Sequence, residues 1–258
     1  MRPPLPTAYC SPATTARLLL AVDDSVSPDL SDQCGILGLA LINADRIPDR
    51  LEVAMALACS GQDTQAIRRG LSAPFTGFIE LGPEGLLGVG MRTFETARAG
   101  GLALSLLTST TFGVSMVELA SEAITRRFRV TSADTAMMIE ICLAEAIGNA
   151  VIHGNLGIPD HLRATPKGFE DFRGIMRERL ADPALAGRRI EVNVTDFGPD
   201  HLAIAVSDQG RGFDLDACLA RGINTDAKSG RGLGLIRKAC ASVLAEDGGS
   251  TLVMTFAR

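Results

Sequence analysis

The sequence predicts an α/β protein of two domains, the first built on a parallel sheet and the second on a mixed sheet. In the first half, short apolar runs alternate with helical segments, as they do where helices join parallel strands. In the second half, a long amphipathic helix precedes two alternating segments that a turn separates, which is typical of paired strands. The 258 residues are enough for two modest cores.

Shifts in composition divide the chain. Residues 1–16 are rich in Pro, Thr and Ala and are expected to form a disordered lead-in. Gly, Ser and Thr accumulate at 100–113 and predict a linker between a first domain at 17–110 and a second at 114–258. The elements expected in the first domain are strands at 17–22, 35–42, 53–59 and 75–81 and helices at 64–71 and 83–98.

The longest helix predicted in the second domain carries the first candidate functional residues. Thr131-Ser-Ala-Asp134 supplies its N-cap, and Gly154-Asn-Leu-Gly-Ile-Pro159 has the Gly and Pro typical of a helix end. The other elements expected here are helices at 114–128, 170–180 and 235–244 and strands at 189–195, 201–207 and 251–256.

Glu145, Asn149 and His153 are four residues apart, so a helix would place all three on one face. The Asn149 amide oxygen can ligate Mg²⁺, while the Glu145 carboxylate can take a proton from an attacking hydroxyl or water. A solvated position is disfavoured for Glu145 because its neighbours are apolar, and an Asn inside a helix needs a bonding partner. For His153 we expect a structural role at the helix end.

A second motif, Asp208-Gln-Gly-Arg-Gly212, follows a predicted strand. Gly210 and Gly212 allow a sharp turn beside a ligand, and the Asp208 carboxylate can accept a hydrogen bond from the exocyclic amine of adenine. The alternative is an ordinary corner between a strand and a turn, where Asp and Gly are common.

The third motif is glycine-rich and precedes a predicted helix. Gly230, Gly232, Leu233 and Gly234 would present backbone N–H groups and the positive end of the helix dipole to phosphate. It lacks the Gly-Lys-Ser/Thr ending of a P-loop. Unlike the glycine-rich turn of a Rossmann fold, it does not follow a predicted strand. The loop at 215–229 is expected to be a lid over the nucleotide.

Together, the three motifs resemble the GHKL (histidine-kinase-like) ATPase family, and most closely its anti-sigma-factor serine/threonine kinase branch. The run 149–156, Asn-Ala-Val-Ile-His-Gly-Asn-Leu, is the most distinctive part of a resemblance that covers about 116–258. It implies a Bergerat-type α/β sandwich that binds ATP and Mg²⁺, with the Thr251 hydroxyl beside Asp208.

The resemblance also implies transfer of the ATP γ-phosphoryl group to Ser or Thr of a partner protein, which would be an anti-sigma antagonist or a sigma-factor-like regulator. One alternative is a nucleotide-dependent binding switch without phosphotransfer, and another is an accessory domain of a phosphatase. A two-component histidine kinase is disfavoured, because none of the three histidines lies in a helical hairpin before Glu145. A homodimer is left open.

The first half resembles a degenerate response-regulator receiver that serves for contacts, with Asp23-Asp24 after its first strand. Asp45 and Asp49 are the candidate phosphate acceptors, and Glu80-Leu-Gly-Pro83 stands where a lysine is expected. The alternative is an unrelated small α/β domain.

Composition excludes some classes of protein. A net charge of −5 argues against a general nucleic-acid binder. The six cysteines form no CxxC pair, so we expect buried free thiols in a reducing cytoplasm. The N-terminus lacks a signal peptide, and the apolar runs are short for a membrane span, which predicts a soluble cytoplasmic protein.

Overall fold

The computed structural model describes residues 18–22, 27–47, 53–60, 63–159, 166–221 and 231–258. The described strands form one nine-stranded mixed sheet in the order β2-β1-β3-β4-β5-β6-β7-β9-β8. They are β1 (Leu18–Val22), β2 (Leu39–Asn43), β3 (Met55–Ser60), β4 (Gly77–Leu81), β5 (Leu102–Leu107), β6 (Arg189–Asp196), β7 (His201–Ser207), β8 (Ser242–Glu246) and β9 (Thr251–Ala257).

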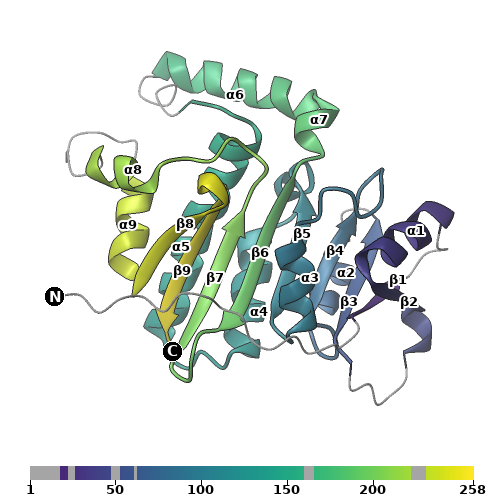
Figure 1. Cartoon of the computed structure of the whole chain (residues 1–258). Helices are drawn as coiled ribbons and strands as arrows, with labels where there is room; N and C mark the ends of the chain where they lie inside the picture. The colour runs from purple at the N-terminus through teal and green to yellow at the C-terminus, as the bar shows by residue number, and fades with distance from the viewer. Residues whose placement is uncertain (1–17, 23–26, 48–52, 61–62, 160–165, 222–230) are drawn as a thin grey trace.

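Helices cover both faces of this sheet (Figure 1). One apolar cluster packs α1 and α3 on one face, and a larger one packs α2, α4, α5 and α9 on the other. The described helices are α1 (Pro28–Leu37), α2 (Thr64–Gly70), α3 (Met91–Arg98), α4 (Met116–Arg127), α5 (Ala133–Asn149), α6 (Pro166–Ala181), α7 (Pro183–Ala186), α8 (Leu215–Arg221) and α9 (Arg231–Ala239).

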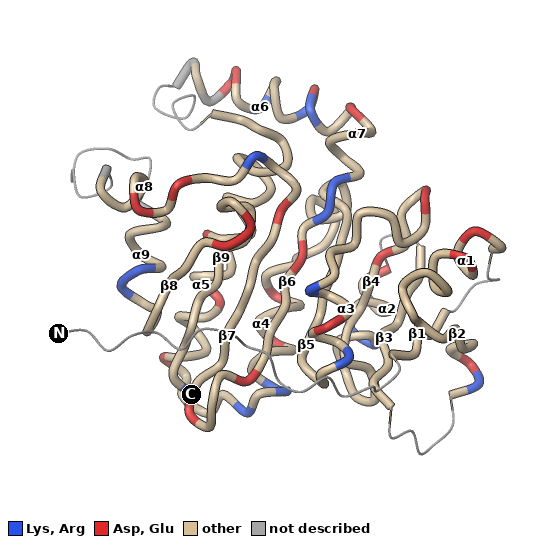
Figure 2. The backbone as a smooth tube through the Cα atoms, viewed as in Figure 1, with Lys and Arg blue, Asp and Glu red and all other residues tan. Residues whose placement is uncertain are grey.

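Strands β1 to β5 are parallel, in the doubly wound order 2-1-3-4-5. Because helices cover both faces, β1 and β3 are almost wholly apolar and do not alternate. In Figure 2, β1 and β3 contain no charged residue, whereas β6 contains both acidic and basic residues. The parallel α/β arrangement predicted for the first half is confirmed, and its likeness to a receiver stays a prediction.

The linker predicted at 100–113 is wrong. Leu102–Leu107 forms β5, whose first five residues are buried, and only a short 3₁₀ turn at Thr110–Phe112 follows. β5 is parallel to β4 and antiparallel to β6, so it joins the parallel and antiparallel parts of one sheet. The division into two domains is therefore not confirmed.

Three other elements differ from expectation. The apolar run 35–42 is split, because Gly38 takes the left-handed conformation that ends α1 (φ 65°), and β2 begins after it. The helix expected at 83–98 begins only at Met91, after a loop. The helix expected at 235–244 ends at Ala239, and Ser242–Glu246 pairs with β9 as strand β8 instead.

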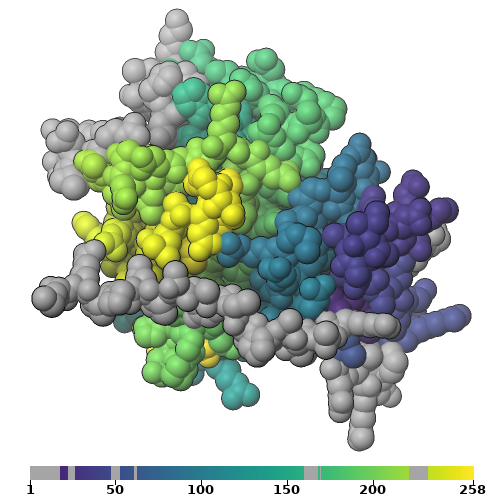
Figure 3. Space-filling view, in the orientation of Figure 1, coloured from purple at the N-terminus to yellow at the C-terminus, as the bar shows by residue number. Residues whose placement is uncertain are grey.

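The two halves pack directly against each other. In the space-filling view, residues of the first half lie beside the last strands of the chain (Figure 3). Arg92 of α3 forms an ion pair with Glu246 of β8 at 2.5 Å. Both side chains are partly exposed, so this pair adds little stability, but it places α3 beside β8.

Helix α5 continues as a π-helix over Ala150–Asn155. By length and composition, Ala133–Asn155 could cross a membrane, which the sequence analysis did not anticipate. Its buried side chains instead belong to the large core cluster beside the sheet. Cys34, Cys59, Cys142 and Cys240 are buried as predicted, whereas Cys218 is only half-buried and Cys10 lies outside the described residues.

Candidate functional site

Helix α5 places Glu145 and Asn149 on its last two turns. The helix begins at Ser132, whose hydroxyl accepts a hydrogen bond from the Thr135 N–H at 3.2 Å, as its predicted N-cap required. Asn149 is half-buried and Glu145 is exposed. The inference that apolar neighbours would bury Glu145 is wrong: Glu145 is exposed although the next two residues, Ala146 and Ile147, are buried on another face of the helix.

His153 does not continue the row of Glu145 and Asn149. It lies in the π-helix, whose wider turn shifts its side chains off the four-residue repeat. The His153 Nδ1 atom is 2.5 Å from the carbonyl oxygen of Ile158. Since a carbonyl only accepts, Nδ1 carries the hydrogen, and the contact gives His153 a structural role in the turn after the helix.

Asn155, which belongs to the distinctive run 149–156 but was assigned no role from the sequence, holds the end of the π-helix to the sheet. It is fully buried, and its amide donates to the Thr108 hydroxyl at 2.7 Å and to the Arg189 carbonyl at 2.9 Å. Its side-chain oxygen accepts from the backbone N–H of Gln209 at 2.7 Å. Its place in the run 149–156 was the signal in the sequence, but that run gives no information about the partners of Asn155 in the sheet.

Asp208 follows β7 and lies against the π-helix. A Cβ atom at Gly154 would be 2.4 Å from the Asp208 Cγ, and one at Gly210 would be 2.4 Å from the Gly154 carbonyl oxygen. Any side chain at either glycine would therefore displace the carboxylate or the backbone beside it. The first and second motifs, distant in the sequence, meet at this contact.

The Asp208 carboxyl group is poorly solvated. Burial raises its pKa to about 6, although the Gly210 N–H donates to it at 2.7 Å and the charge of Arg188 favours ionisation. A half-buried carboxylate beside glycine backbone suits recognition of a planar amine, because a carboxylate that is removed from water and left without a donor would be costly.

The turn after Asp208 packs against the start of β9. Gly212 has a φ of 71°, and a Cβ atom there would be 2.2 Å from the Gly248 carbonyl oxygen, so the position requires glycine. Thr251 is buried opposite Ser207, and the two hydroxyl oxygens are 2.9 Å apart. The Thr251 hydroxyl donates to Asp247, also at 2.9 Å. Thr251 thus lies beside the corner that bears Asp208.

The third motif meets the first. A Cβ atom at Gly232 would be 2.1 Å from the Glu145 carboxylate oxygen, so the first turn of α9 lies against that side chain. Gly232, Leu233 and Gly234 all lie at the N-terminal end of α9 as predicted, and Gly230 lies outside the described residues. Of the lid predicted at 215–229, Leu215–Arg221 is helix α8 and the rest lies outside the described residues.

These contacts bring the three motifs to one surface between α5, the end of β7 and the start of α9. A family model described as a histidine kinase-like ATPase domain matches residues 108–256, from just after β5 to the end of β9. The chain belongs to the histidine kinase-like ATPase family. Its second half is thus an ATP-binding domain of that family, as the sequence predicted. A comparison with curated proteins gave no match.

The residues present in this histidine kinase-like ATPase domain fit a magnesium nucleotide. Mg²⁺ prefers oxygen ligands, and it commonly takes one or two from protein and the rest from phosphates and water. Asn149 and Glu145 supply such oxygens one helical turn apart. Across the described ranges, no group of three or more His, Cys, Asp or Glu gathers around a possible metal. A metal held partly by phosphates does not require one.

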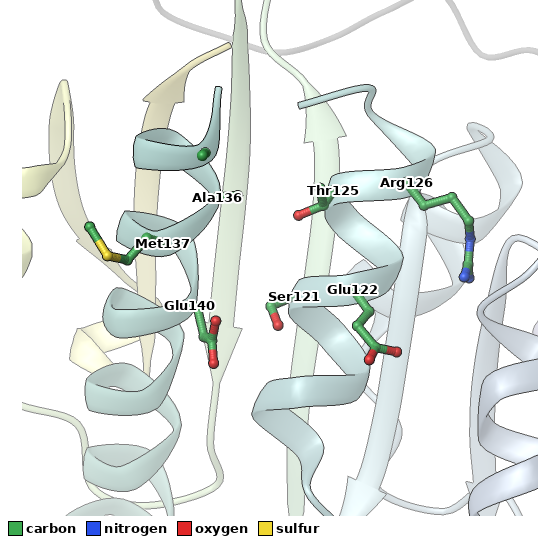
Figure 4. A pocket seen from close by; sticks show the side chains of 8 residues that line it. Ser121, Glu122, Thr125, Arg126, Ala136, Met137 and Glu140 are labelled. Atoms are coloured by element: carbon green, nitrogen blue, oxygen red, sulfur yellow. The ribbon is translucent and has the colours of Figure 1, made fainter. Parts of the chain in front are cut away.

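A groove of about 620 Å³ lies between α4 and the first half of α5 (Figure 4). Ser121 and Glu140 face each other across it, and Met137 and Arg126 stand at its sides. It contains none of the motif residues, so it is separate from the nucleotide site.

The candidate phosphate acceptors of the predicted receiver-like unit do not follow its central strand. Asp45 is exposed in the 3₁₀ turn Ala44–Arg46 after the edge strand β2, and Asp49 lies outside the described residues, as does Asp23-Asp24. The central strand β3 ends at Ser60. Glu80 lies within β4, where its carboxylate accepts from the Thr110 hydroxyl and the Leu107 N–H, and burial raises its pKa.

Proposed function

We propose that this protein is a Mg-ATP-dependent protein serine/threonine kinase of the anti-sigma-factor type. The observation that carries the proposal is the exposed Glu145 carboxylate against the first turn of α9. Within the described residues it forms no ion pair, so it remains available to a hydroxyl group of another protein. A base at the phosphate end of a nucleotide site is the group that transfer to a hydroxyl requires.

The other motif residues hold the nucleotide in this proposal. Asp208 accepts a hydrogen bond from the adenine amine, and Thr251 supports that corner through Ser207. The backbone N–H groups of Gly232, Leu233 and Gly234 bind phosphate oxygens. Asn149 would hold Mg²⁺, which neutralises phosphate charge when bound.

The kind of partner follows from the hydroxyl group that would receive the phosphoryl group. Glu145 is open to solvent, so the hydroxyl group arrives on the surface of a second protein, for which we propose an anti-sigma antagonist. The first half of the chain, for which we propose a receiver-like docking unit, is joined to the second half by the ion pair between Arg92 and Glu246.

The test separates binding from transfer. We expect Glu145→Ala to bind MgATP with wild-type affinity in calorimetry. Its rate of transfer of labelled phosphate to an antagonist encoded by a neighbouring gene should fall at least 100-fold. Asn149→Ala and Asp208→Ala should lose MgATP binding. Glu140→Ala removes a carboxylate from the same helix in the separate groove and serves as the matched control.

Partner regulation that survives in Glu145→Ala would instead indicate a nucleotide-dependent switch without phosphotransfer. Equal MgATP affinity in the wild type, Asn149→Ala and Asp208→Ala would remove the basis of both functions.

A further inference from the structure

The loop between β4 and α3, residues 82–90, belongs to the first half of the chain and lies outside the family match. Two glutamine side chains hold it. Gln33 of α1 donates to the Glu84 carbonyl at 2.9 Å and accepts from the Leu86 N–H at 2.7 Å. Gln209 donates to the Gly88 carbonyl at 2.8 Å and accepts from the Arg189 N–H, also at 2.8 Å.

The guanidinium group of Arg189 also holds this loop, through hydrogen bonds to its backbone carbonyl groups. Arg189 is 2% exposed and donates to the carbonyl groups of Leu87 at 3.1 Å, Gly85 at 3.1 Å and Glu80 at 2.9 Å. A buried cation surrounded by loop carbonyls is costly to rearrange, because each lost bond leaves a desolvated group unpaired. The 82–90 loop therefore has a defined position relative to the start of β6.

The backbone of Gln209 is also connected to the nucleotide site. Its backbone N–H donates to Asn155, which anchors the π-helix, and its preceding neighbour is Asp208. One exposed residue thus contacts a loop of the first half through its side chain and the adenine corner through its backbone. The hydrogen-bonded path runs from Gln33 through the loop to Gln209.

We propose that Gln209 is a positioning residue for ATP binding, through which the 82–90 loop sets the orientation of Asp208. The inference rests on the proposed role of Asp208 toward adenine. It makes the first half a contributor to nucleotide affinity, and any partner that moves the loop changes that affinity. By reciprocity, bound nucleotide must stabilise the loop by the same coupling free energy.

The test is a double-mutant cycle on MgATP affinity, measured by calorimetry on the full chain. Gln209→Ala should raise the Kd about five-fold, and Gln33→Ala about two-fold. The double variant should also stay near five-fold, about half of the ten-fold that independent sites would give. Without the Gln209 side chain the loop no longer acts on Asp208, so the further loss of Gln33 has no effect on the Kd. Gln65→Ala, an exposed glutamine on α2, is the matched control and should not change the Kd.

Two further measurements exclude a merely structural effect. Gln209→Glu keeps the acceptor for Arg189 but places a carboxylate against the Gly88 carbonyl, so it should bind MgATP as weakly as Gln209→Ala. In the wild type, saturating MgATP should slow hydrogen exchange at the Leu86 and Gly90 amides, and Gln209→Ala should lose this slowing.

An unchanged Kd in Gln209→Ala, additive effects in the double variant, or exchange in the loop that ignores MgATP would each overturn the inference. Asp208→Asn separates it from the proposed function. If Asp208→Asn loses binding while Gln209→Ala is unaffected, only the positioning role fails. If Asp208→Asn binds normally, the assignment of adenine to Asp208 fails and the positioning role falls with it.

Discussion

At the scale of single residues, the ionisation of Asp208 should control ATP affinity. The charged carboxylate accepts from the adenine amine more strongly than the neutral acid does, and burial raises the pKa of Asp208 to about 6. Affinity for MgATP should therefore rise with pH between 5 and 7 and be about ten-fold weaker at pH 5 than at pH 8. Calorimetry across this range gives the profile, and carbon NMR of the free protein gives the pKa. A carboxyl group that titrates near 4 would refute the explanation.

The same group should cost stability. The pKa of Asp208 in the folded protein lies above its ordinary value of 3.8, so folding favours the neutral acid. Stability from this source is fully present below pH 4 and is lost as pH rises through 6. Asp208→Asn cannot ionise, and its free energy of unfolding should exceed that of the wild type by about 2 kcal/mol at pH 8. Denaturant unfolding at pH 4 and pH 8 checks this, since the gap should close at the lower pH.

The sequence predicted which residues would meet, and it missed those that hold them together. Glu145, Asp208 and Gly232 belong to motifs whose residue types state their chemistry. Asn155 and Gln209 act through hydrogen bonds to segments distant in the sequence, and spacing within a motif contains no information about such partners. The exposure of Glu145 was also missed, because neighbours in sequence are not neighbours on a helix face.

At the scale of elements, the π-helix and the turn after β7 depend on a contact without side chains. Gly154→Ala would place a methyl group 2.4 Å from the Asp208 Cγ. We expect MgATP affinity to fall more than ten-fold and stability to fall by about 1–3 kcal/mol, as in other overpacked sites. Gly148→Ala on α5 meets nothing within 4 Å and should gain up to about 1 kcal/mol with unchanged affinity. Calorimetry and denaturant unfolding of both variants measure the contrast.

Most elements could be predicted from periodicity, and the errors have physical causes. The sequence predicts a linker in place of β5 because Gly100, Gly101 and the Ser and Thr residues after the strand are typical of loops, whereas the apolar run of the strand itself is short. β8 was taken for the end of a helix because an isolated stretch of five residues shows no clear period. The π-helix leaves no mark in the sequence that helical spacing would reveal.

At the scale of the whole molecule, the continuous sheet should make unfolding cooperative. β5 pairs with β4 on one side and β6 on the other, so neither half can unfold without exposing the strand edge of its neighbour. We expect one calorimetric transition, with equal calorimetric and van't Hoff enthalpies, that MgATP shifts as a unit. Two transitions, of which MgATP moves only one, would show independent domains.

The joining of the two halves into one sheet could not be predicted from the sequence. The parallel half and the mixed half were each predicted, but pairing between β5 and β6 joins strands that the four helices α4 to α7 separate in the sequence. Three charged residues, Arg189, Glu80 and Glu191, are buried at that junction. From the sequence alone, charged residues in a strand are expected to face solvent, because their partners are unknown.

The place where β5 ends has a practical consequence for laboratory work. A fragment that starts at the family boundary retains β6 and discards the strand that pairs with it. The eight residues of β6 would then present a row of vacant amide and carbonyl groups flanked by Ile190, Val192 and Val194. Such an edge is a template for pairing with identical chains, so we expect the excised fragment to self-associate and precipitate.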